Sequence, residues 1–575
     1  MPHPHPIARR LLGRQPIAGA GAVAVCLSVL ACSEPPPPAP TSIALVLVNA
    51  RVWTGDPSEP WLEALAVGDG RIVATGTSRD IRHLAPGAKL IDADRRLVLP
   101  GFIDSYTRVL DVGNRPGGIP LAGLRSRREF VNSVRTVTAT QADGEWVRGH
   151  DWDQRLWDGT LPDRSWIDAV TPKHPVWLVH RDRQAGLANS LALSQARIVA
   201  GLQGAATAPD GTLSGILTGA AMRQLEASLP ALSPAARGRA LDAALLDAAA
   251  RGITSIHHVG GWDDLELFLQ ARAAGRLTLR LHAAVPLSEW LRLDRTIGVG
   301  TFGGTNGRGD DRLRVGAVHT RLDGSLASAT AAFAAPYLDS SGSATTTRPP
   351  PNMKTIRPLA LAADAAGLQM VVEAVGDEAN RAALDLAAHL AAENGPRDRR
   401  FRVAHAQHLH PPDVARFATG RVLASLLPFD ALHDGRWVDA HLGRARGQTS
   451  FAARSLIDTG AGVSFGSGRM NQGSPIDGIY AAVTRRTLDG QHPQGWLPEQ
   501  RVSVEDAVRA YTSAAAYAGF DEARTGSLTV GRFADFVMVD RDLLSVTPTA
   551  IPNVRVLLTV VGGEIVLDRV RRSPS

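Results

Sequence analysis

Short apolar runs alternate with amphipathic stretches over most of this chain. The runs are rich in Val, Ile and Leu, as buried strands are, whereas residues 235–251 and 357–367 have helical periodicity and many alanines. Strand candidates lie at residues 99–104, 176–179, 253–256, 279–282, 315–318, 370–372, 401–404, 422–425 and 462–465. Repeated strand–helix units of this kind predict an α/β fold, a (β/α)₈ TIM barrel built on a parallel sheet.

Further strand signals lie at both ends of the chain, outside this series. Residues 64–76 are predicted to form two strands around the Asp69-Gly70 turn. Residues 526–540 are likewise predicted to form a turn-rich pair of strands, and single strands are predicted at residues 44–53, 554–560 and 563–567. Neither end is long enough to bury a hydrophobic core alone. We therefore expect residues 42–98 and 525–575 to form one composite β-sandwich, beside a barrel over residues 99–524.

The N-terminal region is predicted to be a targeting segment followed by a tether. A basic start precedes an apolar stretch at residues 17–31 that is shorter than a membrane-spanning helix. This stretch ends at Cys32 in a Leu-Ala-Cys sequence that resembles a bacterial lipobox. Residues 1–32 then form a lipoprotein signal peptide and residues 33–41 a proline-rich tether. A plain cleaved signal or an uncleaved anchor stays open as an alternative.

On the lipobox interpretation, Cys32 is lipidated and anchors the protein in the bacterial cell envelope, facing the periplasm. Ser33 after the cysteine favours the outer membrane, by analogy with lipoprotein sorting in Gram-negative bacteria. The membrane partner is thus reached through a lipid and not through a spanning helix.

Charge and cysteine content narrow the possible classes of function. A net charge of +6 and a pI near 9.8 would suit nucleic-acid binding, but the arginines are scattered among 56 acidic residues without a long basic run. We therefore expect no nucleic-acid partner. The two cysteines, Cys26 and Cys32, both lie in the targeting segment, which excludes a disulfide framework or a cysteine zinc site from the rest of the chain. The oligomeric state is left open.

Several short motifs occur in a fixed order along the chain. They are Leu99-Pro100-Gly101-Phe102-Ile103-Asp104, Gly149-His150-Asp151-Trp152-Asp153-Gln154, Leu161-Pro162-Asp163-Arg164, Ala188-Asn189-Ser190, Asp323-Gly324-Ser325-Leu326, Gly376-Asp377-Glu378-Ala379-Asn380, Phe465-Gly466-Ser467 and Gly531-Arg532-Phe533-Ala534-Asp535-Phe536. Together they resemble the metal-dependent amidohydrolase superfamily, in particular the N-substituted formamide deformylase branch of type-three amidohydrolases. The resemblance implies hydrolysis of amide-type C–N bonds. One or two divalent metals at the strand ends would activate water, and an aspartate would move the proton.

The sequence departs from the family pattern at the positions that would carry this chemistry. The two histidines of the first strand fall on Tyr106 and Arg108, the histidine before Gly-Asp on Glu373, and the catalytic aspartate on Gly468, whereas His405 is kept. Arginine stays charged at any useful pH, and its guanidinium repels a divalent cation. We therefore predict an Arg108–Glu373 ion pair in the place of the metal, and we favour no cofactor.

These departures favour a non-catalytic or altered-activity homologue that binds a small, possibly anionic, ligand. The predicted pocket residues are Tyr106, Arg108, Trp152, Gln184, His258 and Asp323, with Gln184 in place of a substrate-loop histidine. An active hydrolase stays open as the alternative. His319, Glu373 and His405 would lie at three strand ends, and two histidines with one glutamate can bind one divalent metal such as zinc.

Overall fold

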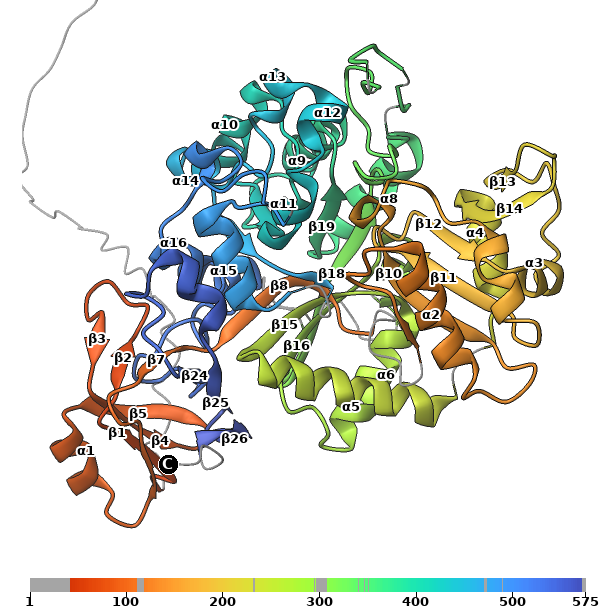
Figure 1. Cartoon of the computed structure of the whole chain (residues 1–575). Helices are drawn as coiled ribbons and strands as arrows, with labels where there is room; N and C mark the ends of the chain where they lie inside the picture. Colours follow the sequence, from red (N-terminus) through yellow and green to blue (C-terminus); the bar gives the residue numbers. More distant parts are fainter. Residues whose placement is uncertain are drawn as a thin grey trace, which may run out of the picture. The chain divides into compact units, whose positions relative to one another are not determined.

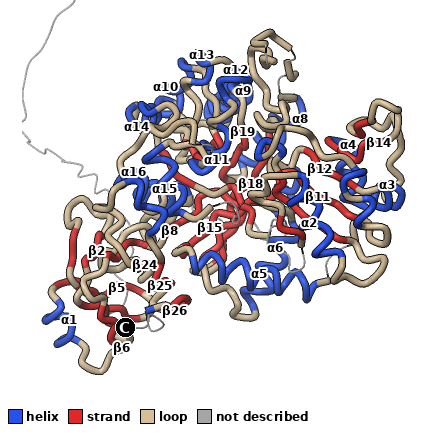
Figure 2. Tube along the Cα trace, viewed as in Figure 1, coloured by secondary structure: helices blue, strands red, loops and turns tan. Residues whose placement is uncertain are grey.

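The structure is a computed structural model of the whole chain. It describes residues 42–110, 118–230, 233–293, 295, 308–339, 341–345, 347–349, 351–469, 473–488 and 490–570. The predicted signal peptide, the tether and Cys32 lie outside these residues. Within the described part, the strands form four sheets, and helices accompany them (Figures 1 and 2).

The largest sheet is parallel and curled, and its strand order is β22-β21-β20-β19-β18-β16-β15-β8-β23. Its strands are β8 (Phe102–Arg108), β15 (Ile253–Val259), β16 (Arg280–Pro286), β18 (Leu313–Arg321), β19 (Gln369–Ala374), β20 (Arg402–His405), β21 (Leu423–Leu426), β22 (Val463–Phe465) and β23 (Gly468–Arg469), with β17 (Arg308–Gly309) antiparallel to β18. Gly466 and Ser467 alone separate β22 from β23, so the chain itself links the two ends of this order. The sheet is consistent with a TIM-barrel-like fold.

The helices that accompany this sheet confirm the two predicted helical stretches, which form α5 and α8. The helices are α5 (Pro234–Ala250), α6 (Trp262–Ala273), α7 (Trp290–Leu293), α8 (Met353–Ala365), α9 (Asp377–Glu393), α10 (Pro411–Thr419), α11 (Pro428–Asp434), α12 (Val438–Leu442), α13 (Arg444–Gly447), α14 (Ala453–Asp458), α15 (Pro475–Thr484), α16 (Val504–Ala510) and α17 (Ser513–Ala518). The side chain of Ser233 caps the first turn of α5, and Pro234 occupies that turn, where its missing N–H costs nothing. No helix among the described residues is long and apolar enough to cross a membrane.

One strand that was predicted for the barrel lies in a second sheet instead. Its order is β13-β14-β12-β11-β10-β9, with strands β9 (Ile119–Pro120), β10 (Val147–Trp152), β11 (Val176–His180), β12 (Ala185–Ala188), β13 (Ala205–Thr207) and β14 (Leu213–Thr218). Helices α2 (Arg127–Thr138), α3 (Ser190–Gln195) and α4 (Gly219–Ser228) accompany it. Residues 176–179 were expected in the barrel, but β11 pairs with β10 and β12. An apolar run marks a buried strand without telling which sheet it joins.

The two ends of the chain meet in one six-stranded sheet of order β26-β25-β24-β7-β2-β3. Its strands are β2 (Arg51–Trp53), β3 (Trp61–Leu62), β7 (Leu97–Pro100), β24 (Phe536–Val539), β25 (Val556–Val561) and β26 (Glu564–Asp568). The ends are joined where β7 pairs antiparallel with β24. A four-stranded sheet of β5 (Arg71–Gly76), β4 (Ala64–Gly68), β1 (Leu45–Val48) and β6 (Lys89–Asp92) shares a hydrophobic cluster with it, to which Leu47 and Phe536 belong. Helix α1 (Ser78–Leu84) packs on β1 and β4.

Two of the predicted terminal strands differ in the structure. Residues 44–53 are not one strand, because Asn49 has a left-handed φ of 52° and turns the chain between β1 and β2. Residues 526–540 form one strand and not two, because turns at Gly526 and Gly531 take up the first part of the segment. The predicted turn at Asp69-Gly70, between β4 and β5, is confirmed.

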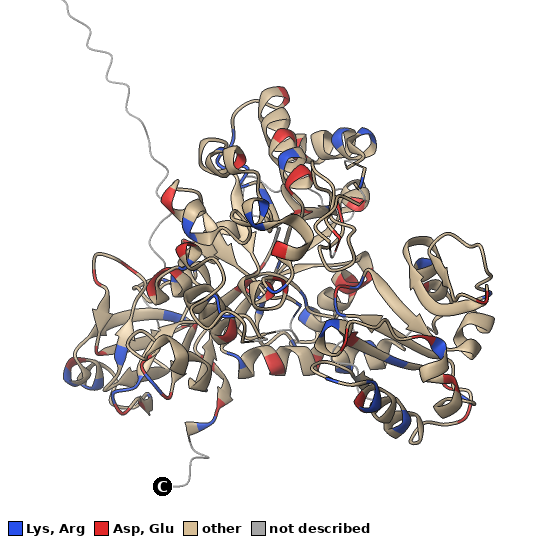
Figure 3. Ribbon diagram, turned by 45° about the horizontal axis from the view of Figure 1, so that its top comes forward, with Lys and Arg blue, Asp and Glu red and all other residues tan. Residues whose placement is uncertain are grey.

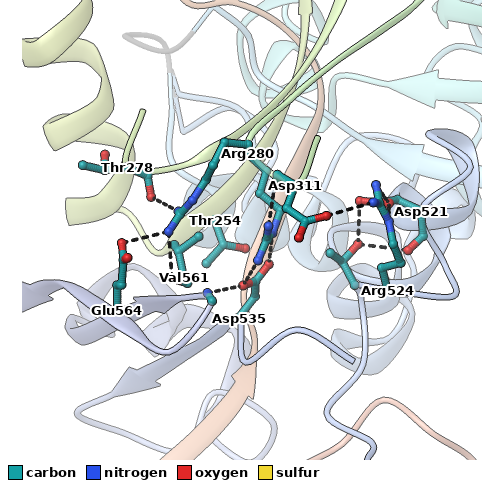
Figure 4. A network of polar contacts seen from close by, with 12 residues as sticks. Thr254, Thr278, Arg280, Asp311, Asp521, Arg524, Asp535, Val561 and Glu564 are labelled. Atoms are coloured by element: carbon teal, nitrogen blue, oxygen red, sulfur yellow. Dashed lines mark hydrogen bonds and ion pairs between the residues drawn. The ribbon is translucent and has the colours of Figure 1, made fainter. Parts of the chain in front are cut away.

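A network of ion pairs ties β16 to the six-stranded sheet (Figure 4). The Nε and Nη2 atoms of Arg280 donate to the two oxygens of Asp535 at 2.7 and 2.9 Å, and both side chains are less than one tenth exposed. Asp535 also accepts the backbone N–H of Gly562 at 2.6 Å. Arg524 extends the network at the surface through Asp311 at 3.2 Å. The buried pair therefore explains the aspartate of the C-terminal motif as a structural residue.

We expect Asp535→Asn to lower the free energy of unfolding by about 3–5 kcal/mol, because it leaves the buried Arg280 cation without its counter-charge. Asp311→Asn is the matched control: its ion pair with Arg524 is largely exposed and contributes at most about 1 kcal/mol. Urea unfolding of both variants followed by circular dichroism measures the difference. Equal destabilisation by the two substitutions would contradict the role assigned to Asp535.

Candidate functional site

A pocket of about 80 Å³ lies where the strands of the curled sheet end. Because parallel strands present their carboxyl ends at one edge, residues far apart in sequence meet there. The strands contribute Tyr106 and Arg108 from β8, Arg321 from β18, Glu373 from β19 and His405 from β20. The turn between β11 and β12 adds Arg181, Asp182 and Gln184 from the second sheet.

The carboxylate of Glu373 is the centre of the site. Its Oε2 accepts the phenol O–H of Tyr106 at 2.7 Å and Nη2 of Arg108 at 3.2 Å. Its Oε1 faces Nη2 of Arg321 at 2.9 Å and Nε2 of His405 at 3.6 Å. The predicted Arg108–Glu373 ion pair is thus confirmed, and Arg321 is a second guanidinium on the same carboxylate.

These neighbours keep Glu373 ionised although it is buried. Burial by itself would raise its pKa, but the charges of Arg321, His405 and Arg108, with the hydrogen bond from Tyr106, hold that pKa well below its usual value. Burial, together with the adjacent charge of Glu373, raises the pKa of Tyr106, so its phenol stays a neutral donor. The site therefore contains a fixed anion that is surrounded by donors.

Two backbone features fix the shape of the pocket. His405 and Ala406 have left-handed φ angles of 67° and 40°, a strained conformation for residues other than glycine. This strain places His405 at the pocket, where its ring meets that of Tyr106 edge to face at 5.8 Å. Gly468 has a φ of +70°, and a Cβ atom there would lie 2.8 Å from Cδ1 of the buried Leu427. The position of the family's aspartate therefore favours glycine.

The turn between β11 and β12 is attached to the pocket by polar contacts. Asp182 accepts Ser325 Oγ at 2.7 Å and pairs with Nδ1 of His180 at 2.6 Å. Arg181 donates to Asp430 of α11 at 3.2 Å, and its carbonyl oxygen accepts a hydrogen bond from Arg469 of β23. The second sheet thus forms one wall of the pocket.

The structure brings only part of the predicted pocket together. Tyr106, Arg108 and Gln184 line it, and Gly468 lies beside them. The other three predicted residues, Trp152, His258 and Asp323, do not line this pocket, because other partners hold them. Trp152 is fully buried and donates to the carbonyl of Leu178, whereas His258 accepts the N–H of Val109 and pairs with Asp264. Asp323 accepts the N–H groups of Ala332, Val375 and Gly376.

Asp323 is a turn residue that holds the end of β19, two positions beyond Glu373. Its carboxylate accepts three backbone N–H groups at 2.8–2.9 Å, two of them from Val375 and Gly376. Burial raises the pKa of Asp323 to about 6 although these donors lower it. Its contribution is therefore to fix the strand end that presents Glu373.

Arg181, Asp182 and Arg321 were missed at the sequence level. Arg321 pairs in register with Glu373 across β18 and β19, and it follows His319 at the spacing that places both on one face of a strand. The charge of Arg321 at the end of a predicted strand could thus have indicated that it belongs to the site. Nothing local marks Arg181 or Asp182, because their place depends on how the second sheet meets the first.

The residues present do not fit a divalent cation. His319 lies outside the pocket lining; its Nε2 is 3.0 Å from the carbonyl oxygen of Gly260, and burial lowers its pKa to about 4. Both oxygens of Glu373 face cations or donors of the protein. Within the described part of the chain, no group of three His, Cys, Asp or Glu side chains is placed to hold a metal ion. His319, Glu373 and His405 are therefore not assembled as a metal cage.

Comparison with known proteins gives the family. The profile described as "Amidohydrolase family" matches residues 89–567. The chain belongs to this family. A relative in Arabidopsis thaliana, the protein LONG AFTER FAR-RED 3, is 31% identical over 540 residues, which cover 90% of this chain and 91% of the relative. The N-substituted formamide deformylase of Arthrobacter pascens is 26% identical and covers 91% of this chain and 98% of its own. The type-three branch inferred from the motifs is thus confirmed.

A solved structure shows the same fold. The chain superposes on an uncharacterized metal-dependent hydrolase from Pyrococcus horikoshii OT3 with a TM-score of 0.71 and 21% identity, over 88% of this chain and 99% of that one. At this identity the likeness concerns the fold alone. The family is one of hydrolases of C–N bonds.

Glu373→Gln tests the electrostatic role of the carboxylate. Because the folded pKa lies below the ordinary value of 4.5, the ionised group adds stability that is fully present above about pH 4.5 and is lost as the pH falls further. We expect the variant to be less stable than the wild type by about 1.5–3 kcal/mol at pH 7, and this difference to shrink between about pH 5 and pH 3.

Urea unfolding at pH 7, 5, 4 and 3 measures this difference. Glu266→Gln is the control, since its ion pair with Arg292 is about half exposed and contributes at most about 1 kcal/mol. A difference between wild type and Glu373→Gln that stays constant across this range would show that the charge of Glu373 does not contribute.

Proposed function

We propose that this amidohydrolase-family protein binds a small anionic ligand in the strand-end pocket and does not carry out metal-dependent hydrolysis. One observation carries the proposal: Arg108, Arg321 and the phenol of Tyr106 occupy both oxygens of Glu373. A cation brought to that carboxylate would meet two guanidiniums. Each pair of unit charges about 4 Å apart costs about 4 kcal/mol at an effective dielectric of 20, and a divalent ion doubles this.

The charges of the pocket are balanced in number but not in exposure. Four arginines and four carboxylates line it. The side chains of Arg321 and Arg108 are 40% and 29% exposed, whereas that of Glu373 is 8% exposed. An entering molecule therefore meets guanidiniums first, and guanidiniums favour carboxylates and other oxyanions.

A metal site rebuilt from His319, Glu373 and His405 is the competing hypothesis. It would require His319 to leave the Gly260 carbonyl and Glu373 to exchange its guanidinium partners for a cation. The left-handed backbone at His405 supports a functional role for this histidine under either hypothesis. We favour ligand binding, because it uses the donors as they stand.

Two features of the architecture also belong to the proposal, the closed barrel and the β-sandwich. We propose that the curled sheet is an eight-position (β/α)₈ barrel, with β22 and β23 sharing the last position. The pairing of Gly468 with Thr107 and of Arg469 with Arg108 supports this. We also propose that the two terminal sheets form a composite β-sandwich, which their shared hydrophobic cluster supports.

We also propose that the protein carries a lipid anchor and has no nucleic-acid partner. Figure 3 shows basic and acidic residues interspersed along the ribbon, which supports the expectation of no nucleic-acid partner. The lipobox-like sequence ending at Cys32 supports a location in the cell envelope, facing the periplasm. Ser33 after this cysteine favours the outer membrane, by analogy with lipoprotein sorting in Gram-negative bacteria.

Metal analysis with a hydrolysis assay tests the main proposal. We expect the purified protein to hold no stoichiometric zinc, manganese or iron, and to hydrolyse neither formamides nor N-acyl substrates with these metals added. His405→Ala is the matched variant, expected to change neither result. Stoichiometric metal together with hydrolysis that a chelator and His405→Ala both abolish would overturn the proposal in favour of the rebuilt site.

Cys32→Ser tests the anchor. We expect the wild-type protein, expressed in a Gram-negative host, to incorporate labelled palmitate and to fractionate with the outer membrane. The variant should incorporate no label, and Cys26→Ser should behave as the wild type, since it lies before the cleavage position. Labelling of Cys32→Ser at the wild-type level would contradict the assignment.

A further inference from the structure

Two arginines of the pocket have donors to spare. Arg321, at the end of β18, uses Nη2 for Glu373 at 2.9 Å. Arg181, in the turn between β11 and β12, uses Nη2 for Asp430 at 3.2 Å. Among the described residues, the other nitrogens of these two guanidiniums have no recorded hydrogen-bond partner. Both side chains line the same pocket, one from each sheet.

The four carboxylates of the pocket already have partners in the protein. Asp430 accepts from Arg181, and Asp434 accepts from Gln407. Glu373 accepts hydrogen bonds from Tyr106 and Arg108 and forms an ion pair with Arg321. Asp182 accepts Ser325 Oγ and the N–H of Gln184, and it pairs with His180. The polar groups of the pocket that no described residue engages therefore include N–H donors of Arg181 and Arg321, which suit a ligand made of acceptors.

The volume of the pocket limits the size of that ligand. At about 80 Å³ it is roughly half of an engineered 150 Å³ cavity that is known to hold benzene. By that comparison it admits a molecule of about three or four non-hydrogen atoms. A planar group of this size with two acceptor oxygens matches the fork of a guanidinium.

We infer that the ligand is a compact monocarboxylate of about three or four non-hydrogen atoms, held between the guanidiniums of Arg181 and Arg321. This inference rests on the proposed function and names its ligand class. The carboxylate accepts from β18 on one side and from the β11–β12 turn on the other. It thereby adds to the contacts that already join the two sheets, among them Asp182–Ser325, Arg181–Asp430 and Arg469 to the carbonyl of Arg181.

Titration calorimetry at constant ionic strength tests the inference with two probes, acetate and benzoate. We expect acetate to bind and benzoate to give no measurable binding. Arg181→Gln and Arg321→Gln should each weaken acetate binding about ten- to hundredfold, since each removes charge-assisted hydrogen bonds. Arg444→Gln, an exposed arginine on α13, should leave the affinity unchanged.

The lysine variants Arg181→Lys and Arg321→Lys keep the charge and lose the fork, so they report on the clamp even where a glutamine variant unfolds. We expect each to weaken acetate binding by about tenfold. Benzoate binding as tight as acetate binding, or full affinity in both Arg181 variants, would overturn the clamp and leave the proposed function standing. If neither probe nor any larger carboxylate binds, the proposed function fails with it.

Discussion

A buried negative charge has to be neutralised, and the candidate site is organised by this requirement at Glu373. Its side chain is 8% exposed, so the carboxylate needs charged or hydrogen-bonding partners close by. β8 supplies Tyr106 and Arg108, β18 supplies Arg321 and β20 supplies His405. Three strand ends thus converge on the carboxylate that the end of β19 presents. The same convergence that lets an amidohydrolase assemble a metal centre here assembles an ion-pair cluster.

Residues 101–104, where β8 begins, have a structural role, unlike the residues further along this strand. A Cβ atom on Gly101 would lie 2.2 Å from atoms of Thr254, so only glycine fits there. Asp104 accepts Ser467 Oγ at 2.5 Å and the N–H of Ser467 at 3.0 Å, which connects β8 to the segment before β23, and burial raises its pKa to about 6. Both residues serve the scaffold. Tyr106 and Arg108, further along the strand, face the pocket instead.

The departures from the family pattern support one another physically. Arg108 would be costly beside a metal, and Glu373 would be costly without a cation; together each stabilises the other. Gly468 is held at a φ of +70° against the buried Leu427, so its backbone and packing favour glycine at this position. The expected departures at positions 106, 108, 373 and 468 are therefore physically compatible with one another. Similarly, Asp535 of the C-terminal motif neutralises the buried Arg280 (Figure 4).

Periodicity in the sequence located most strands of the curled sheet and the helices α5 and α8, because these depend on local side-chain patterns. The resemblance to the family gave the pairing partner of Arg108, because the order of its motifs marks strand ends. The sequence analysis had limits as well. It assigned residues 176–179 to the wrong sheet and missed Arg181 and Arg321, and it placed Trp152, His258 and Asp323 in a pocket that they do not line. Those positions depend on which strands pair and how two sheets meet. The sequence by itself determined the family, because its motifs keep their order along the chain. Only the tertiary structure decided which donors face the pocket, because contacts between distant segments follow from packing and register.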